Sequence, residues 1–278
     1  MNLFKFLKPS APAQPARPER QVRQRNDRPE RQKRGTTPVF TMTVDGRPIR
    51  FGMPTAGTRR FFIPRYEDGS IHEPGATRFL LGALNADSVF LDIGANLGYF
   101  SMVAAGVARA VYSVEAQERM VGIIRDNADL NGYSNVKVIC AAAGDAPALV
   151  TMPEAGRPAT AIGDHAEGFT VPVIRIDDYF RDLSPTVIKI DVEGFELNVL
   201  KGMQDILATG PTIAIELHKR MAEFGATPAA IFEILSDHGY TLRVGEHRNA
   251  SLSLDELGGG ALRGAFNNKM VFCERRAG

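Results

Sequence analysis

The sequence VFLDIGANLGYFS, from Val89 to Ser101, decides the expected fold of this chain. A short apolar run leads into a turn that contains two glycines, and a helix-forming segment follows. A strand that ends in a glycine-containing turn before a helix is how α/β proteins build a nucleotide pocket. The stretch therefore predicts a nucleotide-binding site, and the turn from Gly94 to Gly98 should indicate which nucleotide it binds.

The residues of this turn argue against a dinucleotide. Close approach of the backbone to a pyrophosphate needs glycine at the second position of GxGxxG, where this chain has Asn96. Asparagine tolerates a left-handed backbone, so the turn can form, but its side chain would crowd a pyrophosphate. Asp92 would repel phosphates and suit the ammonium group of a methionine moiety. The pattern favours S-adenosylmethionine over NAD, which leaves an NAD-dependent oxidoreductase of similar topology as the alternative enzyme.

Strand-like and helix-like segments alternate along the rest of the chain. The expected order is a strand at Ala110–Ala116, a helix at Gln117–Leu130, strands at 136–141 and 186–194, a helix at Phe195–Leu207 and a strand at 211–218. Strands separated by helices of this length predict a parallel sheet covered on both faces. In such a sheet the ligand lies at the carboxyl ends of the strands.

Acidic residues mark these strand ends. Glu115 ends the second expected strand, 21 residues after Gly94, which is the separation at which a carboxylate accepts hydrogen bonds from ribose hydroxyls. Asp191 and Glu193 follow the fourth strand, while Glu216 and His218 end the fifth. We therefore expect the cofactor and the acceptor to bind at this edge of the sheet.

Several of these segments together resemble one protein family. VFLDIGANLGYFS, VYSVEA, AAAGD, RIDDY, IKIDVEGFELNVLKG and IAIELH resemble the FkbM-type S-adenosylmethionine-dependent methyltransferases over about residues 70–220. The resemblance implies the class I methyltransferase fold, an α/β, Rossmann-like architecture whose seven-stranded, mostly parallel sheet has an antiparallel last strand and helices on both faces. It also implies O-methylation of a hydroxyl on a sugar, glycan or natural-product acceptor. A non-catalytic protein that keeps the cofactor pocket is the alternative outside the enzymes.

The resemblance also implies roles for individual residues. Glu115 would bind the ribose, and Asp191 and Glu193 would face both cofactor and acceptor. The expected contacts of S-adenosylmethionine are Asp92, Gly94, Asn96, Gly98 and Tyr99 on the methionine side, Glu115, then Ala142, Ala143 and Asp145 near the adenine, and Asp191.

A base at the same strand ends would assist the reaction. Methyl transfer is an in-line displacement, and removal of the hydroxyl proton by a positioned base accelerates it. The candidate catalytic residues are Asp191, Glu193, Glu216 and His218, although Glu216 and His218 have the alternative role of fixing the loop after their strand. Three of these acids also suit Mg²⁺, but we expect a site without metal because one acid should contact the cofactor. Lys189 is expected to pair with a neighbouring carboxylate rather than act as a catalytic amine.

The beginning of the chain differs in composition from the rest. Residues 1–35 carry ten Lys and Arg against three Asp and Glu, a net +7, which leaves −6 for the remainder of a chain of net charge +1. We expect residues 1–36 to be a disordered basic tail, either a solvated linker or a weak peripheral contact with an anionic membrane. The acidic remainder predicts no nucleic-acid partner. Two cysteines in apolar segments, with no apolar run of roughly 20 residues, favour a cytoplasmic protein.

Residues 37–278 are expected to form one methyltransferase domain, with a cap or lid at 37–85 and the Rossmann-like core at 86–278. Within the cap, Thr41–Met53 predicts a hairpin that turns at Asp45 and Gly46. The segment Arg59–Glu73 mixes aromatic, basic and acidic residues. It is expected either to pack on the core or to cover the strand ends as a lid that presents Tyr66, His72 and Glu73 to the acceptor.

Overall fold

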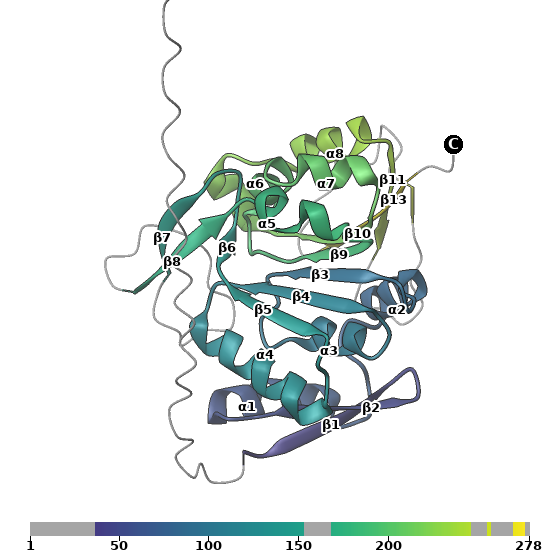
Figure 1. Ribbon diagram of the computed structural model, residues 1–278, viewed down its shortest axis with the longest axis vertical. Helices are drawn as coiled ribbons and strands as arrows, with labels where there is room; N and C mark the ends of the chain where they lie inside the picture. The colour runs from purple at the N-terminus through teal and green to yellow at the C-terminus, as the bar shows by residue number, and fades with distance from the viewer. Residues whose placement is uncertain (1–36, 153–167, 246–254, 257–268, 276–278) are drawn as a thin grey trace, which may run out of the picture. The chain divides into compact units, whose positions relative to one another are not determined.

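The strand that precedes the glycine turn lies inside the main sheet (Figure 1). In the computed structural model this strand, β3 (Val89–Ile93), pairs in parallel with β4 (Ala110–Glu115) on one side and with β9 (Val187–Ile190) on the other. The full order is β12, β11, β13, β10, β9, β3, β4, β5. The other strands are β5 (Val136–Cys140), β10 (Thr212–Leu217), β11 (Tyr240–Gly245), β12 (Asp255–Glu256) and β13 (Lys269–Arg275).

The strand directions confirm the expected class I methyltransferase fold. Strands β5, β4, β3, β9 and β10 run parallel, and β13 runs antiparallel to its neighbours β10 and β11. Apart from the two-residue β12 at the edge, this is the seven-stranded sheet with an antiparallel last strand. The structure describes residues 37–152, 168–245, 255–256 and 269–275.

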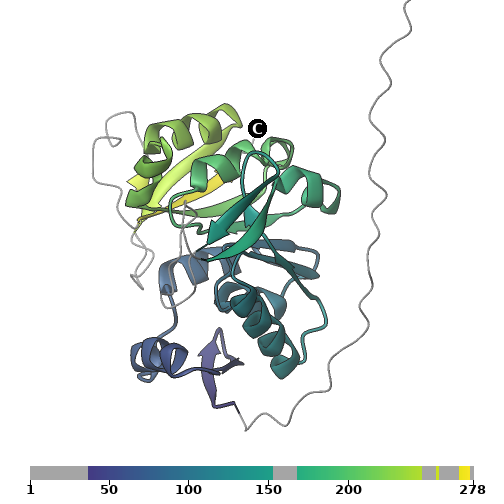
Figure 2. The same ribbon diagram turned by 90° about the vertical axis from the view of Figure 1, so that its left-hand side faces the viewer.

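Helices cover both faces of this sheet, as expected, and Figure 2 shows the two layers from the side. Successive side chains of a strand point to opposite faces, so Leu91 and Ile93 of β3 join one apolar cluster and Phe90 joins the other. The first cluster includes helices α5 (Ile176–Phe180), α6 (Glu196–Lys201), α7 (Gln204–Thr209) and α8 (Pro228–Asp237). The second includes α2 (Pro74–Ala83), α3 (Tyr99–Ala105) and α4 (Glu118–Asn131).

The N-terminal elements extend the second cluster. The predicted hairpin is present as β1 (Val39–Val44) and β2 (Arg47–Gly52), and its turn residues Asp45 and Gly46 have φ of 48° and 72°. Helix α1 (Ala56–Tyr66) follows. The hairpin is fixed to α4, because Asn127 Oδ1 accepts a hydrogen bond from the Gly52 N–H at 2.8 Å. Phe51 stacks on Tyr99 at the start of α3, so the hairpin is packed against the core.

A second, three-stranded sheet lies beside the carboxyl end of β5 (Figure 1). It consists of β6 (Ala142–Ala143), β8 (Phe169–Ile174) and β7 (Ala148–Met152), and the sequence patterns gave no sign of it. Short 3₁₀ helices, η1 (Arg181–Leu183) and η2 (Lys219–Phe224), follow α5 and β10. The small sheet places Ala142 and Ala143 next to the main sheet.

The expectations for the basic tail lie outside the described residues. Among the residues that the structure describes, no helix has the length and apolar character needed to cross a bilayer. Cys140 is half-buried and Cys273 is buried, and neither forms a disulfide.

Candidate active site

A pocket opens at the carboxyl ends of β3, β4 and β9, where the topology predicts a ligand. Its wall combines the glycine turn, the ends of these strands and part of the small sheet. Seven of the residues expected from the sequence line it together, namely Gly94, Asn96, Glu115, Ala142, Ala143, Asp191 and Glu193. Residues that are up to about a hundred positions apart in the chain therefore share one cavity.

The glycine turn has the left-handed backbone expected of it. Gly94, Asn96 and Gly98 have φ of 82°, 52° and 85°. A Cβ atom on Gly94 would lie 1.8 Å from the carbonyl oxygen of Asp191, so only glycine fits where the turn meets the loop after β9. A Cβ atom on Gly98 would lie 3.0 Å from the Ile124 side chain of α4. These glycines allow close contact of the turn with its own protein, and Asn96 adopts the left-handed conformation it was predicted to tolerate.

Glu115 is a buried carboxylate that also organises the turn. Its Oε2 accepts a hydrogen bond from the Asn96 N–H at 2.7 Å, and its Oε1 accepts one from the Gln117 N–H at 2.8 Å. Burial raises the pKa of Glu115 to about 7, although these two backbone donors oppose the shift. Each carboxylate oxygen has a second lone pair, so Glu115 can still accept hydrogen bonds from a ligand in the pocket.

The other four expected cofactor residues lie outside the lining of this pocket. Asp92 is buried between β3 and α3, where its Oδ2 accepts a hydrogen bond from Ser101 Oγ at 2.6 Å. Burial raises the pKa of Asp92, and its Oδ1 has no hydrogen-bond partner among the described residues. Tyr99 is buried with its hydroxyl 3.3 Å from Thr77 Oγ1. Gly98 faces α4, and Asp145 is exposed.

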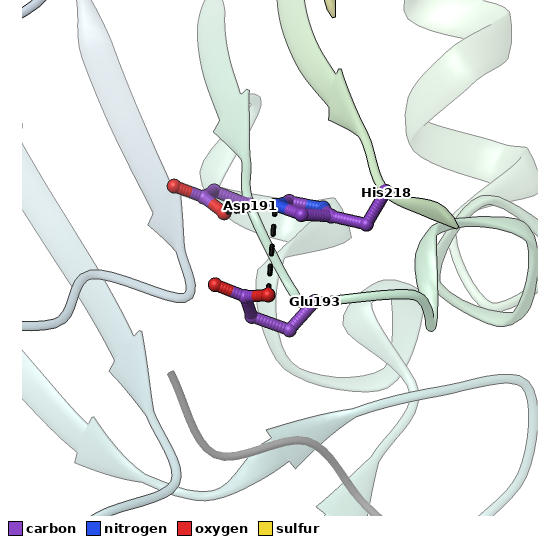
Figure 3. A group of neighbouring side chains, drawn as sticks. All are labelled: Asp191, Glu193 and His218. Atoms are coloured by element: carbon purple, nitrogen blue, oxygen red, sulfur yellow. Dashed lines mark ion pairs between the residues drawn. The ribbon is translucent and has the colours of Figure 1, made fainter. Parts of the chain in front are cut away.

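Next to the pocket lies an acid cluster, which consists of His218 with Asp191, Glu193, Glu196 and Glu216. Figure 3 shows the His218 imidazole directed toward the carboxylates of Asp191 and Glu193. The Nε2 atom lies 3.6 Å from Asp191 Oδ1, 3.7 Å from Glu193 Oε2 and 3.8 Å from Glu216 Oε1. The four catalytic candidates expected from the sequence are therefore brought together around one ring nitrogen.

Glu196 holds the other ring nitrogen of His218. Its Oε1 lies 2.7 Å from His218 Nδ1 and accepts a hydrogen bond from the Gly194 N–H at 2.9 Å. Burial alone would lower the pKa of His218, but the bond to Glu196 and the charges of Asp191 and Glu193 raise it to about 9. His218 is therefore protonated at neutral pH, and both ring nitrogens act as donors.

The two carboxylates that face both His218 and the pocket differ in basicity. Burial would raise the pKa of Asp191, but Lys189 and His218 hold it below its ordinary value. Glu193 is one-third exposed, and burial raises its pKa, although His218 opposes the shift. Glu193 also has φ of 53°, a left-handed conformation that is uncommon outside glycine and clusters at functional sites.

Lys189 pairs with a carboxylate, as predicted. Its Nζ donates a hydrogen bond to Asp191 Oδ2 at 2.7 Å and lies 4.7 Å from the centre of the Phe100 ring. Burial would lower the pKa of Lys189, but the surrounding carboxylates of Asp191, Glu73, Asp92 and Glu216 raise it. The ammonium group therefore stays charged and fixes one oxygen of Asp191, which leaves the other oxygen facing His218.

The expected lid segment packs against α3 near this site. The Tyr66 hydroxyl is hydrogen-bonded to His72 Nδ1, and the His72 ring lies 4.9 Å from the Tyr99 ring. His72 Nε2 lies 3.5 Å from Glu73 Oε1, and Glu73 is buried at the start of α2. The segment Arg59–Glu73 therefore packs against α3, and the Glu73 carboxylate lies near Lys189. The packing role and the lid role expected for this segment both stay predictions.

Sequence reasoning missed Glu196. The only signal for it is its place in IKIDVEGFE, three residues after Glu193, where it reads as the polar first turn of a helix. In the structure its side chain is fully buried instead. The donor atoms of Asp191, Glu193 and His218 lie within 4.8 Å of one another, which is close enough for a single metal ion to contact all three.

Comparison with known proteins agrees with this geometry. A family model described as "Methyltransferase FkbM domain" matches residues 92–242, more than half of the chain. The hexuronic acid methyltransferase AglP of Haloferax volcanii is 27% identical over 172 residues, which are 59% of this chain and 68% of AglP.

Two solved structures show weaker likeness. The methyltransferase FkbM from Methylobacillus flagellatus KT has 22% sequence identity and a TM-score of 0.46, over 67% of this chain and 43% of that one. This chain therefore spans less than half of that protein. An rRNA methylase from Streptococcus thermophilus has 15% identity and a TM-score of 0.46, over 75% of this chain and 99% of that one. At these scores the two likenesses add nothing to the family match.

Proposed function

Because the chain belongs to the FkbM methyltransferase domain family and is a methyltransferase, we propose that it uses S-adenosylmethionine to methylate a hydroxyl group of a sugar, glycan or natural product. The cofactor would supply an electrophilic methyl group. The observation that carries the proposal is the shared pocket of Glu115, the glycine turn and Asp191. The hexuronic acid methyltransferase AglP supports a sugar-like acceptor.

Within this proposal, Glu115 accepts hydrogen bonds from the ribose hydroxyls. Ala142 and Ala143 supply an apolar wall for the adenine, and the left-handed turn at Asn96 borders the methionine side. Asp92 does not itself line the pocket, and in this proposal its buried carboxylate would add negative charge near the ammonium end of the ligand from behind the turn. Gly94 is required for the turn to meet the loop after β9.

The acid cluster then provides the base. His218 is protonated at neutral pH and Asp191 has a lowered pKa, so both are poor proton acceptors. Glu193 lines the pocket and has a raised pKa, and its partial exposure lets it return a proton to water. Bound S-adenosylmethionine would supply the methyl group to the acceptor oxygen, with the electrons of the broken carbon–sulfur bond left on its sulfur, and Glu193 would take the hydroxyl proton.

A metal ion is not part of this proposal. Three carboxylates converge on His218 Nε2. Because the pKa of His218 is about 9, the ring is protonated at neutral pH, and its positive charge already neutralises part of the charge of the carboxylates. The Lys189 ammonium supplies a second fixed cation on Asp191. The protein's own cations therefore offset part of the charge of the four carboxylates, and the proposal includes no further cation.

The cofactor can be tested by calorimetric titration of the full-length protein with S-adenosylhomocysteine and with NAD⁺. We expect S-adenosylhomocysteine to bind, and we expect its affinity to fall as the pH drops below about 7, where Glu115 becomes protonated. The Glu115→Gln variant should bind more weakly and lose this pH dependence. Binding of NAD⁺ without binding of S-adenosylhomocysteine would overturn the proposal.

A further inference from the structure

One carboxylate oxygen joins two separate parts of the acid cluster. Glu196 Oε1 accepts a hydrogen bond from the Gly194 N–H at 2.9 Å and lies 2.7 Å from His218 Nδ1. Gly194 directly follows Glu193 in the loop after β9, whereas His218 follows β10. A single buried atom therefore holds both the peptide that presents Glu193 and the ring that faces Glu193.

The loop that carries Glu193 needs such support. Glu193 and Gly194 have φ of 53° and 113°, and the left-handed region is strained for a non-glycine residue such as Glu193. A Cβ atom on Gly194 would lie 2.9 Å from the backbone carbonyl carbon of Arg220, so the loop is pressed against η2. The hydrogen bond that the Gly194 N–H donates to Glu196 ties the same loop to α6.

We propose that Glu196 is the positioning residue of the active site, fixing the loop that carries Glu193 and the ring of His218 through one oxygen. Glu196 does not line the pocket, and it acts on the reaction only through Glu193 and His218. This role rests on the proposed function, in which Glu193 accepts the hydroxyl proton. Loss of Glu196 would leave the cofactor pocket in place but misplace the base.

A purely structural role is the alternative, and the chain contains a control for it. Asp177 is also a buried carboxylate that accepts two backbone hydrogen bonds, from the Asp205 N–H at 3.1 Å and the Ile206 N–H at 3.0 Å. It fixes the start of α7 and contributes nothing to the pocket wall. Glu196→Gln and Asp177→Asn therefore make the same chemical change at two buried sites, of which only the first faces His218.

The first test is kinetic and uses the full-length protein. We expect Glu196→Gln to lower kcat by about 100-fold, because misplacing a catalytic group by about 1 Å costs this much, while S-adenosylhomocysteine affinity changes less than twofold. Asp177→Asn should leave kcat within about twofold. In a Glu193→Gln background, Glu196→Gln should add less than a twofold loss, since the base that it positions is already absent. The proposal would be overturned if Glu196→Gln lowered kcat by the full factor of about 100-fold in the Glu193→Gln background, or if Glu196→Gln and Asp177→Asn lowered kcat equally.

The second test is spectroscopic and does not require turnover. The groups that face His218 are Asp191 and Glu193 after β9, Glu196 in α6 and Glu216 in β10. Nuclear magnetic resonance of the ring nitrogens in the wild-type protein should show a proton on Nδ1 throughout pH 6–8, as the bond to Glu196 requires. Glu196→Gln should lower the titration midpoint of His218 by about one pH unit or more, and Asp177→Asn should leave it unchanged.

The two tests separate this proposal from the proposed function. A neutral ring that carries its proton only on Nε2 in the wild-type protein would refute the role of Glu196, even if Glu196→Gln fails to fold. Failure of the wild-type protein to bind S-adenosylhomocysteine, with the His218 signals as expected, would refute the proposed function while leaving the Glu196–His218 contact intact.

Discussion

The two halves of the active site are built in different ways. The cofactor half, formed by the glycine turn and Glu115, depends on backbone conformation, because three residues of the turn adopt left-handed φ and the carboxylate accepts backbone N–H groups. The acid cluster depends on charge, because four carboxylates from the loop after β9, from α6 and from β10 surround one imidazole. A change of shape should damage the first half, and a change of charge should damage the second.

Within the proposed function, this difference would separate cofactor binding from catalysis. The glycine turn and Glu115 are joined directly by the hydrogen bond from the Asn96 N–H to Glu115 Oε2, so the geometry of the cofactor half does not require the acid cluster. The two halves meet where the Gly94 backbone packs against the carbonyl oxygen of Asp191. Substitutions can therefore be chosen that affect one half and spare the other.

The largest effect is expected where the halves meet. Gly94→Ala would place a Cβ atom 1.8 Å from the Asp191 oxygen at a residue with φ of 82°, so the turn cannot keep its conformation. We expect loss of about 3 kcal/mol or more in the free energy of unfolding, together with loss of S-adenosylhomocysteine binding. Denaturant unfolding and calorimetry measure both.

The control is Gly122→Ala in α4, where an added Cβ meets nothing within 4 Å. Alanine is a better helix former than glycine, so the free energy of unfolding of this variant should rise by about 0.5–1 kcal/mol. If Gly94→Ala were as stable as Gly122→Ala, the close packing described between the turn and the loop after β9 would be contradicted.

A change confined to the acid cluster should spare binding and remove catalysis. Glu193→Gln keeps the size of the side chain but cannot accept the hydroxyl proton, so kcat should fall by about 10²- to 10⁴-fold. The affinity for S-adenosylhomocysteine should change little, because Glu115 and the turn are intact. Glu223→Gln, at an exposed carboxylate that pairs with Arg220 at 3.1 Å, serves as the matched control. A Glu193→Gln enzyme with nearly full activity would remove Glu193 as the base.

The charge balance of the acid cluster predicts a pH effect on stability. His218 has a pKa of about 9 in the folded protein against an ordinary value of 6.5, so protonation stabilises the fold. This contribution is fully present below about pH 6.5 and is lost as the pH rises through 9, amounting to up to about 3 kcal/mol. Unfolding free energies at pH 7 and pH 10 should differ less in His218→Gln than in the wild-type protein.

His238→Gln is the control for this measurement, because His238 Nε2 contacts Gln204 Oε1 at 3.1 Å rather than a carboxylate. Its loss of stability between the two pH values should match that of the wild-type protein. Equal pH dependence in all three proteins would contradict the protonated His218.

The smallest expected effect concerns metal removal. Because the proton on His218 and the Lys189 ammonium offset part of the charge of the carboxylates, dialysis against a chelator should change the rate by less than about twofold. A rate that disappears with the chelator and returns with Mg²⁺ or Mn²⁺ would place a metal ion among Asp191, Glu193 and His218 instead.

Much of the cofactor half could be predicted from the sequence. The glycine turn and the acid 21 residues after it lie within two strand–turn units, so local spacing determines where both side chains lie. The left-handed conformation of Asn96 also follows from its residue type. The position of Asp92 behind the pocket wall did not follow, because the inward or outward direction of a buried side chain depends on which face of the sheet α3 covers.

The acid cluster was predictable in its members but not in its chemistry. The ends of β9 and β10 bring Asp191, Glu193, Glu216 and His218 together because neighbouring parallel strands end at the same edge. An ordinary imidazole pKa suggested His218 as a base, whereas the surrounding carboxylates keep it protonated. The burial of Glu196 and the formation of the small sheet depend on tertiary packing, which no local sequence pattern indicates.

Transfer of a radiolabelled methyl group from S-adenosylmethionine into a fractionated cell extract tests the central claim most directly. The wild-type protein should label a carbohydrate-containing fraction, the label should resist mild alkali as an ether does, and Glu193→Gln should label it at least about 100-fold more slowly. Alkali-labile label would indicate a carboxylate acceptor. No transfer by a folded protein that binds S-adenosylhomocysteine, or equal rates for wild type and Glu193→Gln, would contradict the proposed hydroxyl methylation.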